Sequence, residues 1–119
     1  MQVTLPWPPS VNTYWRTFQG RMIISAKGRE YRKAVQIALA NAVLLNTLSD
    51  IKVEIVAYRP DNRRRDLDNL LKAPLDALTS AQMWKDDSQI KDLRIRWAEE
   101  VGGMLKVTVT ELKREEGEI

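Results

Sequence analysis

The residues best suited to chemistry lie between Arg63 and Asp76. Three consecutive arginines run directly into Asp66 and Asp68, and Lys72 follows four residues after Asp68. If Asp68 opens a helix, then Asp68, Lys72 and Asp76 share one face of it, because residues four apart are neighbours on a helix surface. Asp66, in the extended lead-in, can point to the same space. This stretch is therefore the first candidate for a catalytic site.

A second acidic pair, Asp86 and Asp87, lies in a loop before a later expected strand. Two ionised carboxylates about 5 Å apart repel by roughly 3 kcal/mol at an effective dielectric of about 20, so a cluster of them needs a cation. Carboxylate oxygens without histidine or cysteine favour Mg²⁺ or Mn²⁺ over zinc. Such an ion, with Lys72 to stabilise developing charge, suits hydrolysis of a phosphodiester.

The same residues also have structural interpretations. Asp66 or Asp68 could serve as an N-cap. The stripe from Asp68 to Asp76 could consist of surface ion pairs, and Asp86 and Asp87 could be turn residues. The arginine run and the second acidic pair bring the catalytic interpretation level with these alternatives.

Composition excludes several kinds of site. The 119 residues contain no cysteine and no histidine. The chain therefore has no disulfide, no zinc-thiolate or iron–sulfur site, no Ser–His or Cys–His triad and no histidine base. Hydrolytic chemistry must use carboxylates, lysine and an oxygen-ligated cation. The length is typical of one domain, so we expect residues 1–119 to form a single domain with a charged, frayed tail at 113–119.

Charge is divided unevenly along the chain, whose net charge is +3. Residues 1–65 carry eleven Lys and Arg against four acids, whereas residues 66–92 carry six Asp against three Lys. A basic surround with an acidic island indicates a site that attracts phosphate and also holds a cation, and scattered solvated charge is the alternative. The candidate DNA-binding cations lie in the arginine run and in the first turns of an expected helix: Arg63, Arg64, Arg65, Lys27, Arg29, Arg32 and Lys33.

The elements expected to position these residues alternate between strand and helix. Apolar periodicity predicts strands at 2–5, 51–58, 90–97 and 104–111, and helices at 26–45 and 68–80. Pro74 requires either a loose first turn, with the regular helix starting near Leu71, or a kink. Gly102 and Gly103 predict a hairpin between the last two strands. The β-α-β-α-β-β order predicts an α+β (mixed α/β) fold, with a mixed sheet packed against two helices.

Residues 6–24 have the pattern of an extended loop that holds four aromatic residues. These aromatic side chains cover the core in one interpretation and stack on nucleic-acid bases in the other. The N-terminus lacks the apolar segment of a signal peptide, and the most apolar stretch, Ala34–Leu45, is too short to span a bilayer. We therefore expect a soluble, cytoplasmic protein with no membrane partner.

Four segments of the chain carry a distinctive pattern. They are Leu5–Asn12 (LPWPPSVN), Arg63–Lys72 (RRRDLDNLLK), Leu75–Leu78 (LDAL) and Trp84–Gln89 (WKDDSQ). Together they resemble the RusA family of Holliday junction resolvases, and the resemblance runs from Leu5 to about Thr110. Its most specific part is the Arg-Asp-Leu-Asp-Asn block with its lysine, followed by the Asp-Asp pair.

The resemblance implies a small, Mg²⁺-dependent, homodimeric endodeoxyribonuclease of bacteria or of their phages and prophages, with Mn²⁺ as a substitute for Mg²⁺. Such an enzyme makes paired symmetric nicks across a four-way DNA junction in recombination and repair. The family's essential acids, which would also hold the metal, fall on Asp66, Asp68 and Asp87. Its essential lysine falls on Lys72.

Asp86 sits beside the expected catalytic acid Asp87, and Asp76 matches an acid in the family's second helix. Both are candidates for supporting roles. The chain departs from the family pattern at two places. Pro74 stands where a helix former is expected, and Asn62 stands where a longer arginine run is expected. Neither departure touches the expected ligands.

A two-fold symmetric dimer also follows from the expected substrate, because resolution needs two coordinated cuts and one small domain carries one acidic site. Two other functions stay open. One is a non-catalytic DNA-binding module or relic of a prophage resolvase, which should have lost an Asp or Lys72. The other is a metal-dependent nuclease of broader range that cuts flaps or plain duplex.

Overall fold

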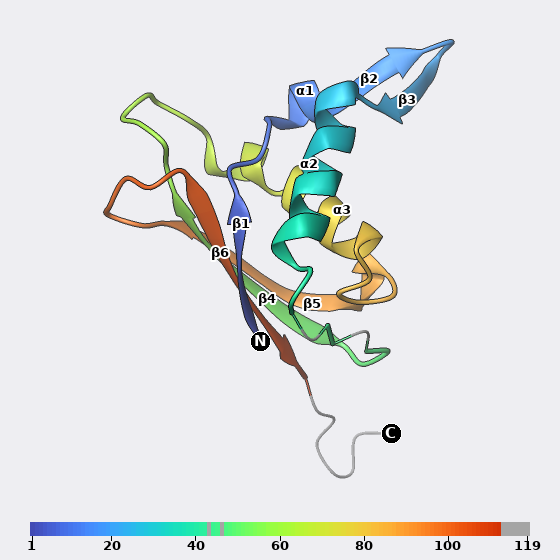
Figure 1. Ribbon diagram of the computed structural model, residues 1–119, viewed down its shortest axis with the longest axis vertical. Helices are drawn as coiled ribbons and strands as arrows, with labels where there is room; N and C mark the ends of the chain where they lie inside the picture. Colours follow the sequence, from blue (N-terminus) through green and yellow to red (C-terminus); the bar gives the residue numbers. More distant parts are fainter. Residues whose placement is uncertain (43, 46, 113–119) are drawn as a thin grey trace.

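The computed structural model describes residues 1–112 except Val43 and Asn46, and the tail expected at 113–119 lies outside this range. Its main feature is a four-stranded sheet in the order β1-β6-β4-β5 (Figure 1). Strand β4 pairs parallel with β5 and antiparallel with β6, and β6 pairs antiparallel with β1. The strands are β1 Gln2–Pro6, β4 Ile51–Tyr58, β5 Ile90–Trp97 and β6 Met104–Glu111. The predicted mixed sheet is confirmed, with three of its four strands at the predicted bounds.

The hairpin predicted between the last two strands is wrong. Strands β5 and β6 run in opposite directions, but β4 lies between them. Every second residue of β6 from Leu105 to Val109 is buried, whereas no residue of β5, which is an edge strand, is fully buried. Gly103, at a φ of 75°, still makes a turn, and its N–H donates to the Tyr58 carbonyl at 2.7 Å.

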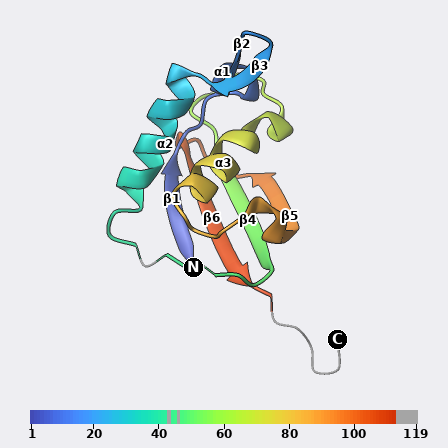
Figure 2. The same ribbon diagram turned by 90° about the vertical axis from the view of Figure 1, so that its right-hand side faces the viewer.

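Two helices, α2 Ala26–Ala38 and α3 Lys72–Ser80, pack against each other on one face of the sheet (Figures 1 and 2). Alternation along the strands supplies the apolar side of the core, and the helices cover it. Buried residues of these elements include Val53, Ile55, Ala57, Leu105, Val107, Val109, Tyr31, Val35, Ala73, Ala77 and Leu78. None of the helices in the described part of the chain is long and apolar enough to cross a membrane.

Helix α2 ends at Ala38, seven residues before the predicted end. After it, Ala40 and Ala42 donate to carbonyls three residues back, at 3.1 and 2.9 Å, so the chain tightens into turns. Leu44 and Leu45 nevertheless pack against the core. The apolar spacing that predicted a helix up to residue 45 therefore reports burial rather than helical backbone.

The predicted helix 68–80 is divided into a 3₁₀ turn, η1 Leu67–Leu70, and the regular helix α3. Pro74 is the third residue of α3, where a backbone donor has no intrahelical partner in any case. The loose first turn, rather than a kink, thus accommodates the proline. A second 3₁₀ turn, η2 Asp87–Gln89, leads into β5.

The interpretation of residues 6–24 as loop alone is wrong. They contain a short helix, α1 Val11–Tyr14, and a two-stranded hairpin of β2 Trp15–Phe18 and β3 Arg21–Ile24. Gln19 and Gly20 join the two strands with φ of 50° and 75°, the conformation of a type I′ turn. The strands lack an apolar alternation because the hairpin, apart from Trp15 and Ile24 at its base, stands outside the core, so the period-2 signal is missing.

Gly28 fixes the base of this hairpin against the start of α2. A Cβ at position 28 would lie 2.6 Å from the Tyr14 carbonyl oxygen and 2.6 Å from Cγ1 of Ile24. The Gly28 N–H also donates to the side chain of Ser25, the N-cap of α2, at 3.0 Å. Only glycine permits this close approach.

We expect Gly28→Ala to lower the free energy of unfolding by about 1–3 kcal/mol, because backbone on one side of the clash cannot yield. The measurement is the urea midpoint of the variant against the wild-type protein. Lys33→Ala, at an exposed position of the same helix, is the control and should change the midpoint little. An unchanged midpoint for Gly28→Ala would contradict the tight packing.

Candidate active site

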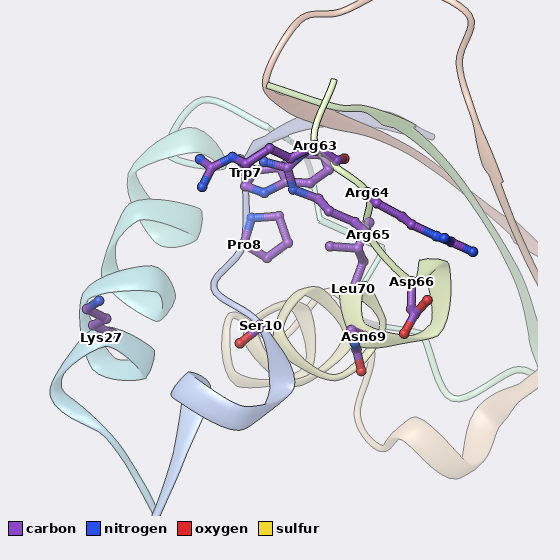
Figure 3. Close-up of a pocket in the computed structure, with 10 residues that line it drawn as sticks. All are labelled: Trp7, Pro8, Ser10, Lys27, Arg63, Arg64, Arg65, Asp66, Asn69 and Leu70. Atoms are coloured by element: carbon purple, nitrogen blue, oxygen red, sulfur yellow. Dashed lines mark hydrogen bonds between the residues drawn. The ribbon is translucent and has the colours of Figure 1, made fainter. Parts of the chain in front are cut away.

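An open cleft of about 1010 Å³ lies where the end of β1, the start of α2 and the segment entering η1 meet (Figure 3). Its walls are mostly polar and carry more positive than negative charge. The lining residues are Trp7, Pro8, Ser10, Lys27, Arg63, Arg64, Arg65, Asp66, Asn69 and Leu70. The cleft therefore joins the predicted arginine run, one cation of α2 and one predicted catalytic acid.

Asp61 organises the arginine run. Its carboxylate pairs with Arg63 at 3.1 Å and with Arg65 at 2.8 Å. Hydrogen bonds from the Arg65 side chain, and then from the backbone and side chain of Arg63, hold the pKa of Asp61 well below its usual range. Arg64 has no carboxylate within ion-pair distance among the described residues, and it points away from Arg63 in Figure 3. Arg64 is thus the cation of the run best placed to meet a phosphate.

Arg65 also anchors the run to the fold. Its guanidinium lies over the Trp7 ring, 5.7 Å from the centroid, and Trp7 stacks on Trp97 of β5 at 6.2 Å. Only a fifth of the Arg65 side chain is exposed, against four-fifths of Arg63. This stack fixes the wall of the cleft on the sheet.

The four residues predicted to be catalytic are Asp66, Asp68, Lys72 and Asp87, and all four are exposed. Within the described part of the chain, none of them is in an ion pair. Asp66 stands at the N-cap position of η1, yet its side chain makes no cap hydrogen bond. The N-cap interpretation therefore does not account for Asp66, and the ion-pair interpretation does not account for Asp68 or Lys72.

Asp86 has the structural role of a turn residue, which was the alternative to a catalytic role. Its side chain accepts from the Ser88 N–H at 3.3 Å and forms a capping box with Gln89 at the start of η2. This backbone hydrogen bond is the largest cause that lowers the pKa of Asp86. Asp86 is thus a turn residue that presents its neighbour, Asp87, at the surface.

Gln89 is a positioning residue that the sequence reasoning missed. Its buried carboxamide oxygen accepts from the backbone N–H groups of Lys85 and Asp86, at 2.9 and 2.8 Å. Its nitrogen donates to the carbonyls of Thr47 and Ser49, both at 2.8 Å. Gln89 therefore ties the loop of Asp87 to the segment before β4. Its place at the end of the capping box was the one signal that could have marked it.

The predicted metal ligands belong to neighbouring elements, since η1 and η2 both pack against α3, which begins at Lys72. Among residues 1–112, without the two omitted positions, no three Asp, Glu, His or Cys side chains are grouped closely enough to hold a metal ion. Asp66, Asp68 and Asp87 are thus not assembled into one site. Their donor chemistry does fit a hard divalent cation, because they offer exposed carboxylate oxygens that no Lys or Arg occupies.

Comparison with known proteins decides the family. The family model for endodeoxyribonuclease RusA matches residues 6–110. The chain is 47% identical over 115 residues to the crossover junction endodeoxyribonuclease RusA of Shigella sonnei, covering 95% of this chain and 96% of that protein. It is 46% identical to the protein of that name from Escherichia coli K12, and 45% identical to that of Enterobacteria phage 82, with the same coverage. The chain belongs to the RusA family. The predicted resemblance is confirmed, and the RusA match contains every candidate site residue.

Asp76, a candidate for a supporting role in this RusA chain, lies in a polar cluster between helices. Arg32 of α2 binds its carboxylate through Nη2 at 2.7 Å and through Nε at 2.8 Å. The Tyr14 hydroxyl donates to the same carboxylate. Burial, followed by this hydrogen bond, raises the pKa of Tyr14 far above its ordinary value. Asp76 thus joins α1, α2 and α3, and Arg32 faces it rather than the cleft.

We expect Asp76→Asn to lower the free energy of unfolding by about 1–3 kcal/mol, because the partly buried Arg32 guanidinium loses its charge partner. Chemical denaturation measures this, with Asp92→Asn, in the exposed pair with Arg94, as a control that should lose less than about 1 kcal/mol. If the Asp76 variant kept full stability, the cluster would not hold the helices together.

The other basic residues of α2 divide by location. Lys27 lines the cleft. Arg29 donates to the carbonyl of Ile24 at 3.1 Å and so fixes the end of β3. Lys33 is exposed one turn further along the helix. Of the four predicted cations of α2, Lys27 is therefore the one that the structure brings to the arginine run.

Proposed function

We propose that this chain is a Mg²⁺-dependent endodeoxyribonuclease that resolves four-way DNA junctions by paired symmetric nicks. Its relatives are named crossover junction endodeoxyribonucleases, which supports a branched DNA substrate. The observation that carries the proposal is the set of exposed residues Asp66, Asp68, Lys72 and Asp87, none of them ion-paired within the described chain. One of them, Asp66, lines the basic cleft. Relatives from bacteria and a phage support action on DNA in the bacterial cytoplasm.

The cations of the cleft would bind the DNA. Arg64 and Lys27 offer charges without an acidic partner among the described residues, and Arg63 is largely exposed although it pairs with Asp61. Contacts of this kind go to phosphates, so they read backbone shape and weaken with added salt. Junction affinity should therefore fall steeply between about 50 and 200 mM salt.

The acids and Lys72 would carry out the hydrolysis. Asp66, Asp68 and Asp87 would hold Mg²⁺, with Mn²⁺ as a substitute, and the bound ion supplies an activated water and charge neutralisation. Lys72 would donate to a phosphate oxygen as negative charge develops on it. Because the three acids are not grouped in the structure, the proposal requires their carboxylates to come together when ion and DNA bind.

A homodimer completes the proposal. A four-way junction is two-fold symmetric and must be cut twice, on strands of like polarity. One chain carries one candidate site, so a C₂ pair presents one site to each strand.

The test compares a labelled four-way junction with a linear duplex of matching sequence, each in Mg²⁺ and then in EDTA. We expect paired nicks in the junction only, and only with the metal. Tight binding without nicks in Mg²⁺ or Mn²⁺ would favour the non-catalytic module, although no acid of the expected set has been lost. Equal cutting of junction and duplex would favour a nuclease of broader range.

A further inference from the structure

The β2–β3 hairpin projects from the body of the molecule beyond the start of α2 (Figure 1). Its outer part is exposed, including Phe18 with 49% and Met22 with 67% of the surface open to solvent. The other three aromatic residues of the 6–24 segment pack into or against the core: Trp7, Tyr14 and Trp15. Phe18 is therefore the one aromatic residue of this segment that does not cover the core.

One face of the hairpin combines this aromatic ring with positive charge. Cross-strand pairs share a face, so the pairs Phe18–Arg21 and Arg16–Ile23 lie on one side and Thr17–Met22 on the other. The Arg16 guanidinium already lies over the Phe18 ring, 5.3 Å from its centroid. Residues 15–24 contain two arginines and no acid.

The hairpin is also tied to the cleft. The chain enters it from Ser10 and α1 and leaves it toward Lys27, and Ser10 and Lys27 both line the cleft. The contacts of Gly28 and the Ser25 cap fix the hairpin on this edge. DNA held by the arginine run can therefore extend along the hairpin.

We propose that the face formed by Arg16, Phe18 and Arg21 stacks on a DNA base that is exposed at the branch point, with the arginines on the flanking phosphates. The proposal rests on the proposed function and gives this chain a residue that selects branched over linear DNA. Aromatic rings flanked by arginine bind unstacked bases regardless of sequence, whereas the bases of a linear duplex are already stacked. A second copy of the chain is disfavoured as the occupant, because two such faces would bring four arginines together.

The test measures binding in EDTA of Phe18→Ala to a four-way junction and to a matched duplex, with 2-aminopurine beside the crossover as a stacking probe. We expect junction affinity to fall by roughly 5- to 100-fold, the value of one stacked base, with duplex affinity unchanged and the wild-type change in probe fluorescence lost. The Phe18→Trp variant should keep both the junction affinity and the change in probe fluorescence of the wild-type protein. Met22→Ala, on the opposite face of the same hairpin, is the matched control and should bind like the wild-type protein.

Unchanged junction affinity, or equal losses for junction and duplex, would overturn the stacking role while the wild-type protein still binds and nicks the junction. Sedimentation of Phe18→Ala as monomers where the wild-type protein is dimeric would assign the face to the second copy instead. A wild-type protein that neither binds nor nicks the junction would overturn the proposed function, and this proposal with it.

Discussion

The Asp66→Asn variant is expected to bind a four-way junction at least as tightly as the wild-type protein and to cut it more than about 100-fold more slowly. Loss of an outer-shell partner of a metal site already costs about 10–100-fold, and a direct ligand should cost more. Binding persists because the arginine run and Lys27 are untouched, and one negative charge facing phosphate is removed. Gel shift in EDTA and single-turnover nicking in Mg²⁺ separate the two effects.

The matched control for this variant is Asp92→Asn. Asp92 is an aspartate of β5 that pairs with Arg94 at 3.2 Å and does not line the cleft. It should cut at the wild-type rate. Wild-type nicking by Asp66→Asn, or an equal loss by both variants, would remove Asp66 from the proposed chemistry.

The Lys72→Ala variant is expected to lose about 10²- to 10³-fold in kcat with little change in KM. This is the range for one donor that acts on charge developing in the transition state. Lys72 is suited to that role because it is exposed at the first turn of α3 and pairs with neither Asp68 nor Asp76 in the structure. The measurement is nicking rate against junction concentration in Mg²⁺.

Lys52→Ala is the control for this second variant, because Lys52 pairs with Glu54 on β4 and lies outside the cleft. Its rate should match that of the wild-type protein. A rise in KM alone for Lys72→Ala would make Lys72 a DNA-binding residue rather than a catalytic one.

Much of the fold follows from the sequence because burial and backbone period agree. Strand β4 alternates with period two over its whole length, and β5 and β6 do so over most of theirs; each was predicted at its observed bounds. The order of the strands does not follow from local pattern. The order depends on which strands are hydrogen-bonded to neighbours on both edges. A turn signal such as Gly102-Gly103 indicates only that the chain reverses direction.

The candidate site could be predicted from the sequence only in part, because local pattern does not report long-range contacts. The types and spacing of Asp66, Asp68 and Lys72 mark the segment, but spacing alone cannot separate Asp76, which binds Arg32, from its exposed neighbours. Gln89 was missed because its partners lie about 40 residues away at Thr47 and Ser49. Long-range hydrogen bonds leave no local periodicity in a sequence.

The most direct test of the central claim uses a supercoiled plasmid that extrudes a cruciform. A dimer with one metal-dependent site per chain makes both cuts within one binding event, so wild-type protein in Mg²⁺ should convert the plasmid to linear product, and EDTA should leave it supercoiled. Asp66→Asn should leave the plasmid supercoiled in Mg²⁺ as well. Nicked circles as the main product, or linear product in EDTA, would contradict paired, metal-dependent cutting by this chain.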